Sequence, residues 1–364
     1  MKIIFNKKYK DFFLLILAFI FLFIYYYLKP KEIKIKNEYY TEMIIAAEKN
    51  KLLQEEIFNE KLRKGIEIDK NLDRNETGFI GLEWSGITTT LGDIEAKRTS
   101  TNPDFAALLV KLFKEVGLKK GDIVAANFSS SFPALNLAFI SAADTLGIKA
   151  IIITSVGSST YGGNIENFTY LDMENYLYSK KLINNRTIAY SLGGAGDIGK
   201  EFDKDIIEKI KNRLDSYDLN FFYEENFEKN LEDRYEFYKI LSKGNIKAFI
   251  NIGGNLLSLG KNADIIDNQK ILLDKSTAIK TGLVEKFLKD DIPVFYLLNI
   301  KSIALYYNLE FDPDKFSEIG TSSIYYIPSK NFWNYIIITI FSLFIVTHII
   351  FFKFKKNKFI KISL

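Results

Sequence analysis

Two long stretches without a charged residue lie near the ends of the chain, and they limit where a soluble domain can form. They are residues 12–28 (FFLLILAFIFLFIYYYL) and 332–352 (FWNYIIITIFSLFIVTHIIFF). Both are close to the roughly 17 to 25 apolar residues that span a bilayer as a helix, and their aromatic ends suit the boundary between lipid and water. We therefore predict a transmembrane helix at each stretch. Only the residues between them are left to form a soluble core.

Lysines beside these stretches predict the orientation of the chain in a cell membrane, because short cationic flanks stay in the cytoplasm. The twenty residues before the second stretch contain only Lys315 and Lys330, whereas five lysines follow it: Lys353, Lys355, Lys356, Lys358 and Lys361. We expect residues 1–11 and 353–364 to be cytoplasmic tails and the central domain to be extracytoplasmic. A cleaved signal peptide is the alternative for the first stretch, but no small-x-small cleavage site precedes Lys29.

The charge of the central segment argues against a general attraction to nucleic acid. The chain carries a net charge of +4, yet residues 1–28 contribute +3 and residues 332–364 contribute +5, which leaves −4 for the middle. The sequence has no cysteine, and its one histidine, His348, falls within the second apolar stretch. Disulfides, thiolate nucleophiles, a Ser-His-Asp triad and imidazole metal ligands are therefore excluded from the central domain. We predict neither a metal site nor a cofactor.

Short strand-like runs alternate with helical patterns between residues 77 and 325. The runs are rich in β-branched and aromatic residues and read FIGLEWSGI, DIVAAN, KAIIITS, RTIAYSL, LNFFYE, KAFINI and IPVFYLL. Helical patterns include residues 102–117, 197–214 and 277–290. Apolar strands joined through helices indicate an α/β domain over residues 77–325, with a doubly wound, mostly parallel sheet. Residues 29–76, which have helical spacing and dense charge, are expected to form a helical stalk or the first helix of that domain.

Three consecutive serines, Ser129, Ser130 and Ser131, follow the run DIVAAN and precede a small-residue helix. Ligands of such sheets gather where strands end and helices begin, since open amides and the helix dipole favour negative charge. We expect Ser131 to cap the helix beginning at Phe132, with Ser129 and Ser130 facing a crevice. The alternatives are that all three only satisfy turn donors, or that one is a nucleophile activated by a lysine.

The glycine-rich stretch SLGGAGDIG contains Gly194, Gly196 and Gly199 in the spacing G-x-G-x-x-G, and Glu224 ends the next strand-like run. This context is typical of a dinucleotide-binding turn. A plain tight turn, or a turn that binds another anion, has the same pattern.

The loop WSGITTTLGDIEAKRTSTNPDF is long and polar, which favours a functional segment over a simple connection. Lys97 and Arg98 could bind carboxylates, while Glu83, Asp93 and Glu95 could hold a cation or act as acid-base groups. An internal cluster of salt bridges is the alternative interpretation.

A fourth polar stretch, SVGSSTYGGNIENFTYLDMENYL, follows the third strand-like run. It places Ser158, Ser159, Thr160 and Asn164 at the same edge of the predicted sheet, and Asp172 leads into a helix as a further acidic candidate. Because several hydroxyl-rich loops follow neighbouring strands, we expect them to line one shared cleft.

The segments GLEWSGITTTLGDIEAKRTSTNPDFAALLV, SSSFPALN, SSTYGGN and FTYLDME resemble those of the poly-γ-glutamate system protein family, which are membrane accessory proteins of poly-γ-glutamate capsule synthesis. The resemblance covers about residues 79–177 and continues more loosely through SLGGAGDIG and NIGGN. It implies a role in the synthesis, export or surface handling of that polymer, with other membrane subunits as partners. The chain lacks a G-x-x-x-x-G-K-[ST] loop, which argues against the ATP-dependent ligase of such a system.

Three functions stay open on the sequence. The first is an accessory component that binds the polymer or partner subunits through a hydroxyl- and glycine-rich cleft. The second is a hydrolase or transferase acting on γ-glutamyl bonds through a Ser/Lys or carboxylate site. The third is a nucleotide or sugar-phosphate binding module.

Overall fold

The computed structural model of the protein describes residues 33–260, 268–274 and 282–329, together with some helical residues in the end segments: 16, 19, 20, 23, 336, 338–343, 345 and 347. The chain divides into two compact units, one of residues 1–36 with 326–364 and one of residues 37–325. In the first unit, β1 (Ile33–Lys36) pairs antiparallel with β10 (Tyr326–Ser329). Among the described residues no helix has the length and apolarity needed to cross a membrane. Both predicted spans, with His348, lie mostly outside those residues and stay predictions.

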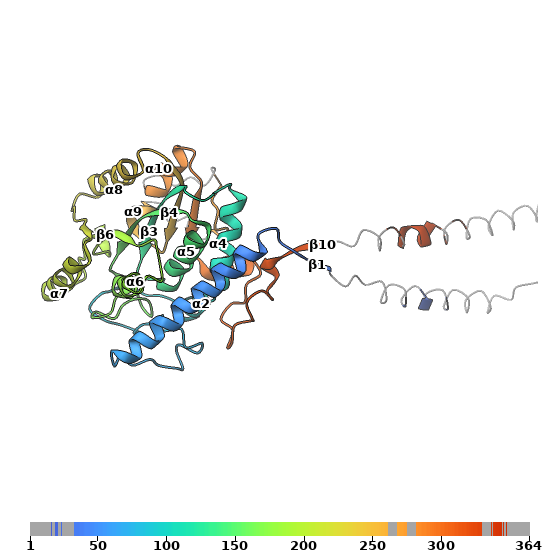
Figure 1. Ribbon diagram of the computed structural model, residues 1–364, viewed down its shortest axis with the longest axis horizontal. Coiled ribbons are helices and arrows are strands. Elements are labelled where there is room, and N and C mark those ends of the chain that lie inside the picture. Colours follow the sequence, from blue (N-terminus) through green and yellow to red (C-terminus); the bar gives the residue numbers. More distant parts are fainter. Residues whose placement is uncertain are drawn as a thin grey trace, which may run out of the picture. The chain divides into compact units, whose positions relative to one another are not determined.

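The second unit is built around a six-stranded parallel sheet (Figure 1). Its spatial order is β7 (Asn220–Phe221), β6 (Thr187–Ser191), β4 (Lys149–Ser155), β3 (Ile123–Ser129), β8 (Ile246–Ile252) and β9 (Val294–Leu297). Six of the seven predicted runs form these strands, which confirms the α/β class and the parallel sheet. The chain moves outward from β3 to β7 and then returns to β8 on the other side of β3. The strand order therefore reverses between β3 and β8.

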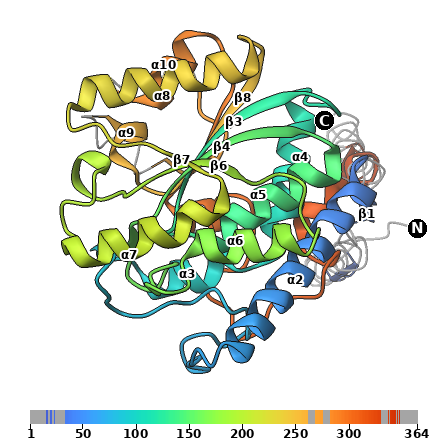
Figure 2. The ribbon, with the colours of Figure 1, turned by 60° about the vertical axis from the view of Figure 1, so that its left-hand side comes forward.

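Alternate residues of each strand point to opposite faces of the sheet. Helices cover both faces. In β3, Phe128 packs edge to face on Phe139 of α5. On the opposite face, Phe249 of β8 stacks on Phe287 at a centroid distance of 4.2 Å. Figure 2 shows the two layers of helices, one on each face of the sheet. The helices on the Phe139 side include α4 (Asp104–Glu115) and α5 (Pro133–Leu146), and those on the other side include α8 (Phe227–Ser242), α9 (Leu256–Leu259) and α10 (Leu283–Lys289).

Further helices lie in the connections between the strands. They are α3 (Ile94–Ser100), α6 (Tyr170–Ser179), α7 (Lys204–Leu214) and α11 (Ile300–Tyr306), with short 3₁₀ turns at Ala195–Asp197, Asp215–Tyr217 and Ser323–Tyr325. The predicted helices at 102–117, 197–214 and 277–290 correspond to α4, α7 and α10. Helix α7 starts only at Lys204, after the predicted start at residue 197, so it is separated from the glycine-rich turn.

Helix α2 (Tyr40–Arg63) rules out the first alternative for residues 29–76, a separate stalk, and confirms the second, the first helix of the α/β unit. This helix belongs to the α/β unit and packs on α4 and α5. Its buried residues recur every three to four positions and form a mainly apolar stripe, which includes Met43, Ala46, Ala47, Asn50, Leu53 and Ile57. Burying this stripe on α4 and α5 removes apolar surface from water, so the helix is stable there and not as a free element.

Residues 79–87 correct a second expectation, because the run FIGLEWSGI forms no strand. A short strand, β2 (Thr88–Thr90), begins after it and pairs with β5 (Ser158–Ser159) outside the main sheet. The side chain of Asn164 accepts from the backbone N–H of Leu82 at 2.9 Å and donates to its carbonyl at 2.8 Å. One amide side chain thus replaces the hydrogen bonds of a neighbouring strand, and Asn164 has a structural role.

Candidate functional site

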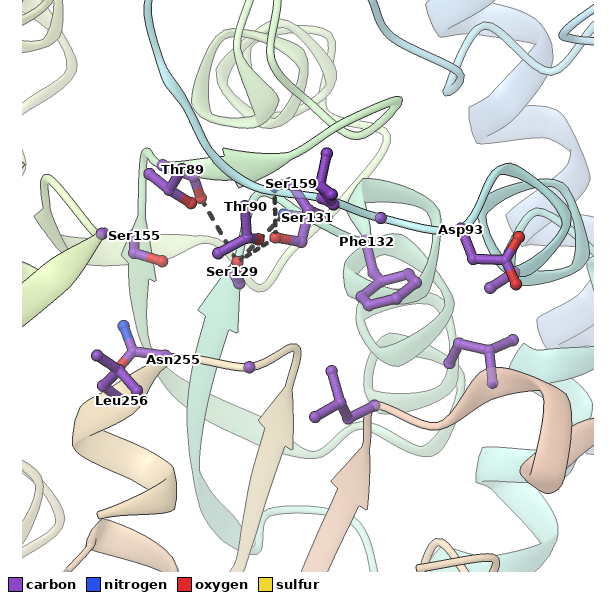
Figure 3. Close-up of a pocket in the computed structure, with 18 of the residues that line it drawn as sticks. Thr89, Thr90, Asp93, Ser129, Ser131, Phe132, Ser155, Ser159, Asn255 and Leu256 are labelled. Carbon is purple, nitrogen blue, oxygen red and sulfur yellow. Dashed lines mark hydrogen bonds between the residues drawn. The ribbon is translucent and has the colours of Figure 1, made fainter. Parts of the chain in front are cut away.

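A cavity of about 630 Å³ opens at the carboxyl edge of the sheet, where the strand order reverses between β3 and β8 (Figure 3). Loops that follow five of the six parallel strands line it, together with β2 and the loop after it. The lining residues include Thr89, Thr90, Ser129, Ser155, Ser159 and Asn255. Ligands of doubly wound proteins bind at such a reversal point. The prediction that several polar loops share one cleft is confirmed for the loops after β3, β4 and β6.

Ser131 has a role different from the predicted helix cap. Its hydroxyl oxygen accepts from Ser129 Oγ at 3.0 Å and from the backbone N–H of Ser159 at 3.0 Å. Helix α5 starts at Pro133, its N-cap is Phe132, and no side chain caps it. Pro133 needs no cap acceptor because it has no N–H. Ser131 therefore ties the loop after β3 to the loop after β4, and Ser129 and Ser131 both line the cavity.

Ser130 and Ser158 are fully buried and do not face the cavity. Ser130 Oγ donates to the carbonyl of Ser155 at 2.8 Å, and Ser158 Oγ donates to the carbonyl of Ser130 at 3.2 Å. Thr160 is bonded to both backbone groups of Gly92, which it joins to the same loops. These three hydroxyls, predicted to bind a ligand, bond instead to backbone groups of the chain, as buried polar groups generally do.

Lys97, expected to bind carboxylates at the surface, is instead buried with only 2% of the residue exposed. Its Nζ donates to the carbonyl of Ser131 and lies 2.7 Å from Ser159 Oγ. The ammonium also stands over the ring of Phe132, 3.9 Å from its centroid. Burial lowers the pKa of Lys97 from 10.5 to about 7. A lysine in this state exchanges its proton near neutral pH.

Arg98 binds a carboxylate of the chain itself. Its Nε and one terminal nitrogen donate to Asp312 at 2.6 and 2.7 Å, and Arg74 bonds to the same carboxylate at 2.6 Å. Burial alone would raise the pKa of Asp312, but the hydrogen bonds from the two arginines outweigh it and lower that pKa. The salt-bridge interpretation of this loop is the correct one for Arg98.

The glycine-rich turn is already filled by a carboxylate. Gly194 and Gly196 have φ of +71° and +70°, conformations that favour glycine. The backbone N–H of Ala195 between them donates to both carboxylate oxygens of Glu201, at 2.9 and 3.2 Å. Because α7 begins only at Lys204, the turn does not lead directly into a helix N-terminus. Both findings disfavour a dinucleotide at this turn, and Glu224 instead bonds to Lys229 on the surface.

The acidic candidates Glu83, Asp93, Glu95 and Asp172 do not form one cluster at the cavity. Glu83 is exposed and does not line the cavity. Asp93 lines the cavity and caps α3 by accepting from the backbone N–H of Glu95 at 3.0 Å, and a hydrogen bond with Asp93 raises the pKa of Glu95. Asp172 caps α6 and pairs with Arg213 at 2.8 Å, which is a structural role. Over the described residues, no group of three or more His, Asp or Glu forms a metal site.

A buried polar network behind the cavity was missed by the sequence interpretation. Arg234 of α8 and Asp197 form an ion pair that is almost completely buried. The other Asp197 oxygen accepts from Asn255, a cavity residue, at 2.8 Å. Arg234 also donates to Asn127 of β3 at 3.2 Å. The one available signal was Arg234 on the apolar face of a helix, because a charge there requires a buried partner.

The fold and the cavity define a doubly wound α/β protein with a hydroxyl-lined binding site at its topological switch point. No protein-family model, no curated protein and no solved structure matches this chain. Its function must therefore be inferred from the site and from the residues that form it.

Proposed function

We propose that the protein is a membrane-anchored component of poly-γ-glutamate synthesis or export, and that its α/β unit binds a segment of the γ-glutamyl chain in the switch-point cavity. One observation carries the proposal. Of the four segments that resemble the poly-γ-glutamate system family, three (residues 81–110, 129–136 and 158–164) contribute residues to the lining of this cavity, and residues 168–174 do not. Three segments that are separate in the sequence and share this resemblance therefore meet at one candidate binding site.

The lining suits a chain of amides and carboxylates. The Thr90 hydroxyl can donate to carbonyl and carboxylate oxygens, whereas Ser129 and Ser155, whose protons bond to Ser131 Oγ and to the carbonyl of Phe128, can accept from amide N–H groups. Lys301 adds a cation from the start of α11. Asp93 and Glu201 also line the cavity, and their carboxylates repel a ligand that carries many negative charges. We therefore expect recognition through hydrogen bonds, with a weaker salt dependence than a basic cleft would have.

The anchoring, orientation and partners belong to the same proposal. Transmembrane helices at 12–28 and 332–352 would hold the α/β unit outside the cell membrane, close to other membrane subunits that make or export the polymer. Protease accessibility in intact cells and in inverted vesicles tests the orientation. A unit cleaved only in inverted vesicles would lie in the cytoplasm, against the proposal.

The binding test uses the full chain in detergent and fluorescently labelled poly-γ-glutamate of defined length. Thr90 is exposed at the cavity, so Thr90→Trp fills the entrance without disturbing the core. We expect it to weaken binding by at least about 10-fold, which corresponds to about 1.4 kcal/mol. The matched control, Thr321→Trp, changes an exposed threonine away from the cavity lining and should keep the wild-type affinity. No saturable binding, or equal affinities for both variants, would refute the proposal.

A further inference from the structure

We propose that Lys97 and Ser159 form a serine–lysine catalytic pair, and that the cavity cleaves or transfers γ-glutamyl amide bonds as well as binding them. The choice of substrate rests on the proposed function, whereas the pair itself rests on geometry. Ser159 Oγ is a nucleophile and Lys97 is its general base. This pair is the one place among the described residues where a lysine nitrogen meets a hydroxyl that lines the cavity.

Two elements distant in sequence bring the pair together. Lys97 comes from α3, and Ser159 comes from β5, which is held by its pairing with β2. Their Nζ and Oγ atoms are 2.7 Å apart, within the reach of a proton transfer. Ser159 lines the cavity, so a carbonyl bound there can approach its oxygen.

The hydrogen bonds of Lys97 leave its lone pair for Ser159. The carbonyl oxygen of Ser131 can only accept, so Lys97 must donate to it. A neutral amine still has a lone pair, and Ser159 Oγ has no other hydrogen-bond partner among the described residues. The Ser159 proton can therefore point at Lys97. The low pKa of Lys97 supports this state, because half of the side chains are neutral near pH 7.

The neighbouring serines do not fit this role. Ser129 Oγ donates to Ser131, and Ser131 Oγ is occupied as an acceptor by two donors. Ser130 and Ser158 are buried and donate to backbone carbonyls. The sequence interpretation considered Ser129 to Ser131 as nucleophiles with a lysine base, and the structure assigns the nucleophile to Ser159.

The reaction balances with water or an amine as the second substrate. Neutral Lys97 takes the hydroxyl proton while Ser159 Oγ bonds to the γ-carbonyl carbon. The tetrahedral intermediate collapses, the C–N bond breaks, and the Lys97 ammonium returns the proton to the leaving amine. Water then attacks the carbonyl carbon of the Ser159 ester and loses a proton to Lys97. The bond between that carbon and Ser159 Oγ breaks, Lys97 returns the proton to Ser159 Oγ, and a carboxylic acid is released. An amine acceptor in place of water yields a new amide and thus a transfer.

A second buried lysine provides a matched control. Lys61 is 1% exposed, and burial lowers its pKa to about 8, with a small opposing effect of Asp73. Its Nζ contacts the carbonyl of Ile80 at 3.5 Å and no serine hydroxyl, and the residue does not line the cavity. Lys61→Met therefore removes a buried lysine without touching the proposed chemistry.

The test labels the full chain in detergent with a fluorophosphonate, which phosphonylates an activated serine and releases fluoride, and locates the adduct by peptide mass spectrometry. We expect an adduct at Ser159, its loss in Ser159→Ala, and labelling at least about 100-fold slower in Lys97→Met than in wild type or Lys61→Met. Ser216→Ala, at an exposed serine, should label normally. In parallel, new amino termini are counted after incubation with poly-γ-glutamate, and Ser159→Ala should release none while still binding the polymer.

The outcomes separate the two proposals. No adduct at Ser159, or labelling that Lys97→Met leaves unchanged, overturns the catalytic pair even if the polymer binds. Labelling that depends on Lys97, without binding or cleavage of poly-γ-glutamate, supports the pair and overturns the polymer as its substrate. Cleavage that persists in Ser159→Ala also overturns the pair.

Discussion

Replacing Lys97 by methionine should make the protein more stable at neutral pH and inactive as a catalyst. The side chain is buried and its pKa is lowered from 10.5 to about 7 by burial alone. An unfolded lysine keeps its proton up to about pH 10.4. The folded state therefore loses stability as the pH falls from 10.5 to 7, and below pH 7 the full penalty is present. Methionine has a similar length and carries no charge, so it removes the penalty.

The size of the stability change follows from the pKa shift of Lys97. At about 1.36 kcal/mol per pKa unit, the lowered pKa of Lys97 costs about 5 kcal/mol below pH 7 and about 4 kcal/mol at pH 7. Against this gain, methionine leaves the carbonyl of Ser131 without a donor, at about 1–3 kcal/mol. We expect Lys97→Met to raise the free energy of unfolding by about 1–3 kcal/mol at pH 7. The gain should vanish and reverse as the pH approaches 10.5.

Urea titration of the full chain in detergent between pH 7 and 10.5 measures this difference. The ionisable groups on the elements around Lys97 do not contribute to its pKa shift, and they are present in both proteins: Asp93, Glu95, Arg98, Lys301 and Asp312. Lys61→Met, which removes the smaller shift to about 8, should stabilise less and keep fluorophosphonate labelling. A Lys97→Met protein that is less stable than wild type by the same amount at every pH would refute the reasoning, because Lys97 would then act as a structural cation.

Four other variants are compared with wild type in the same urea titration. Asp197→Asn leaves the buried guanidinium of Arg234 without its carboxylate and should cost about 3–5 kcal/mol, whereas Asp205→Asn, in an exposed helix pair, should change stability by less than about 0.5 kcal/mol; equal effects would contradict a tightly buried pair. Burial raises the pKa of Glu174 from 4.5 to about 7, so wild type should lose about 3 kcal/mol as the pH rises through that range, and Glu174→Gln should lack this loss. Arg98→Ala should lower stability by about 1–3 kcal/mol and leave poly-γ-glutamate affinity unchanged; weaker binding would return Arg98 to the ligand site.

Much of the fold could be predicted because its signals are local. Runs such as KAIIITS and KAFINI are apolar and β-branched, and helical segments separate most of them, so a parallel sheet follows from crossover geometry. One wrong prediction and one open alternative both have tertiary causes. FIGLEWSGI has strand-forming residues, but Asn164 provides the hydrogen bonds that Leu82 would otherwise find in a sheet. Helix α2 has both dense charge and apolar residues at helical spacing, and only the packed structure shows that its apolar stripe is buried on α4 and α5.

The sequence predicted where the candidate site lies better than it predicted which side chains face it. Parallel strands end at one edge, so the loops holding Ser129, Ser159 and Gly194 had to lie near one another. Which side chains face the cavity depends on burial and on partners far along the chain. Arg98 meets Asp312 across 214 positions, and Lys97 meets Ser159 across 62.

The sequence by itself determined that the central chain forms an α/β unit, that its polar loops share one edge, and that no histidine or cysteine takes part in their chemistry. Those properties depend on residue type and local periodicity. Only the tertiary structure decided that Arg98 is neutralised by an internal carboxylate, that Glu201 fills the glycine-rich turn, and that Lys97 is buried beside a serine hydroxyl. Such pairings arise when distant segments pack, because removal from water sets both the charge state of a side chain and the partner it needs.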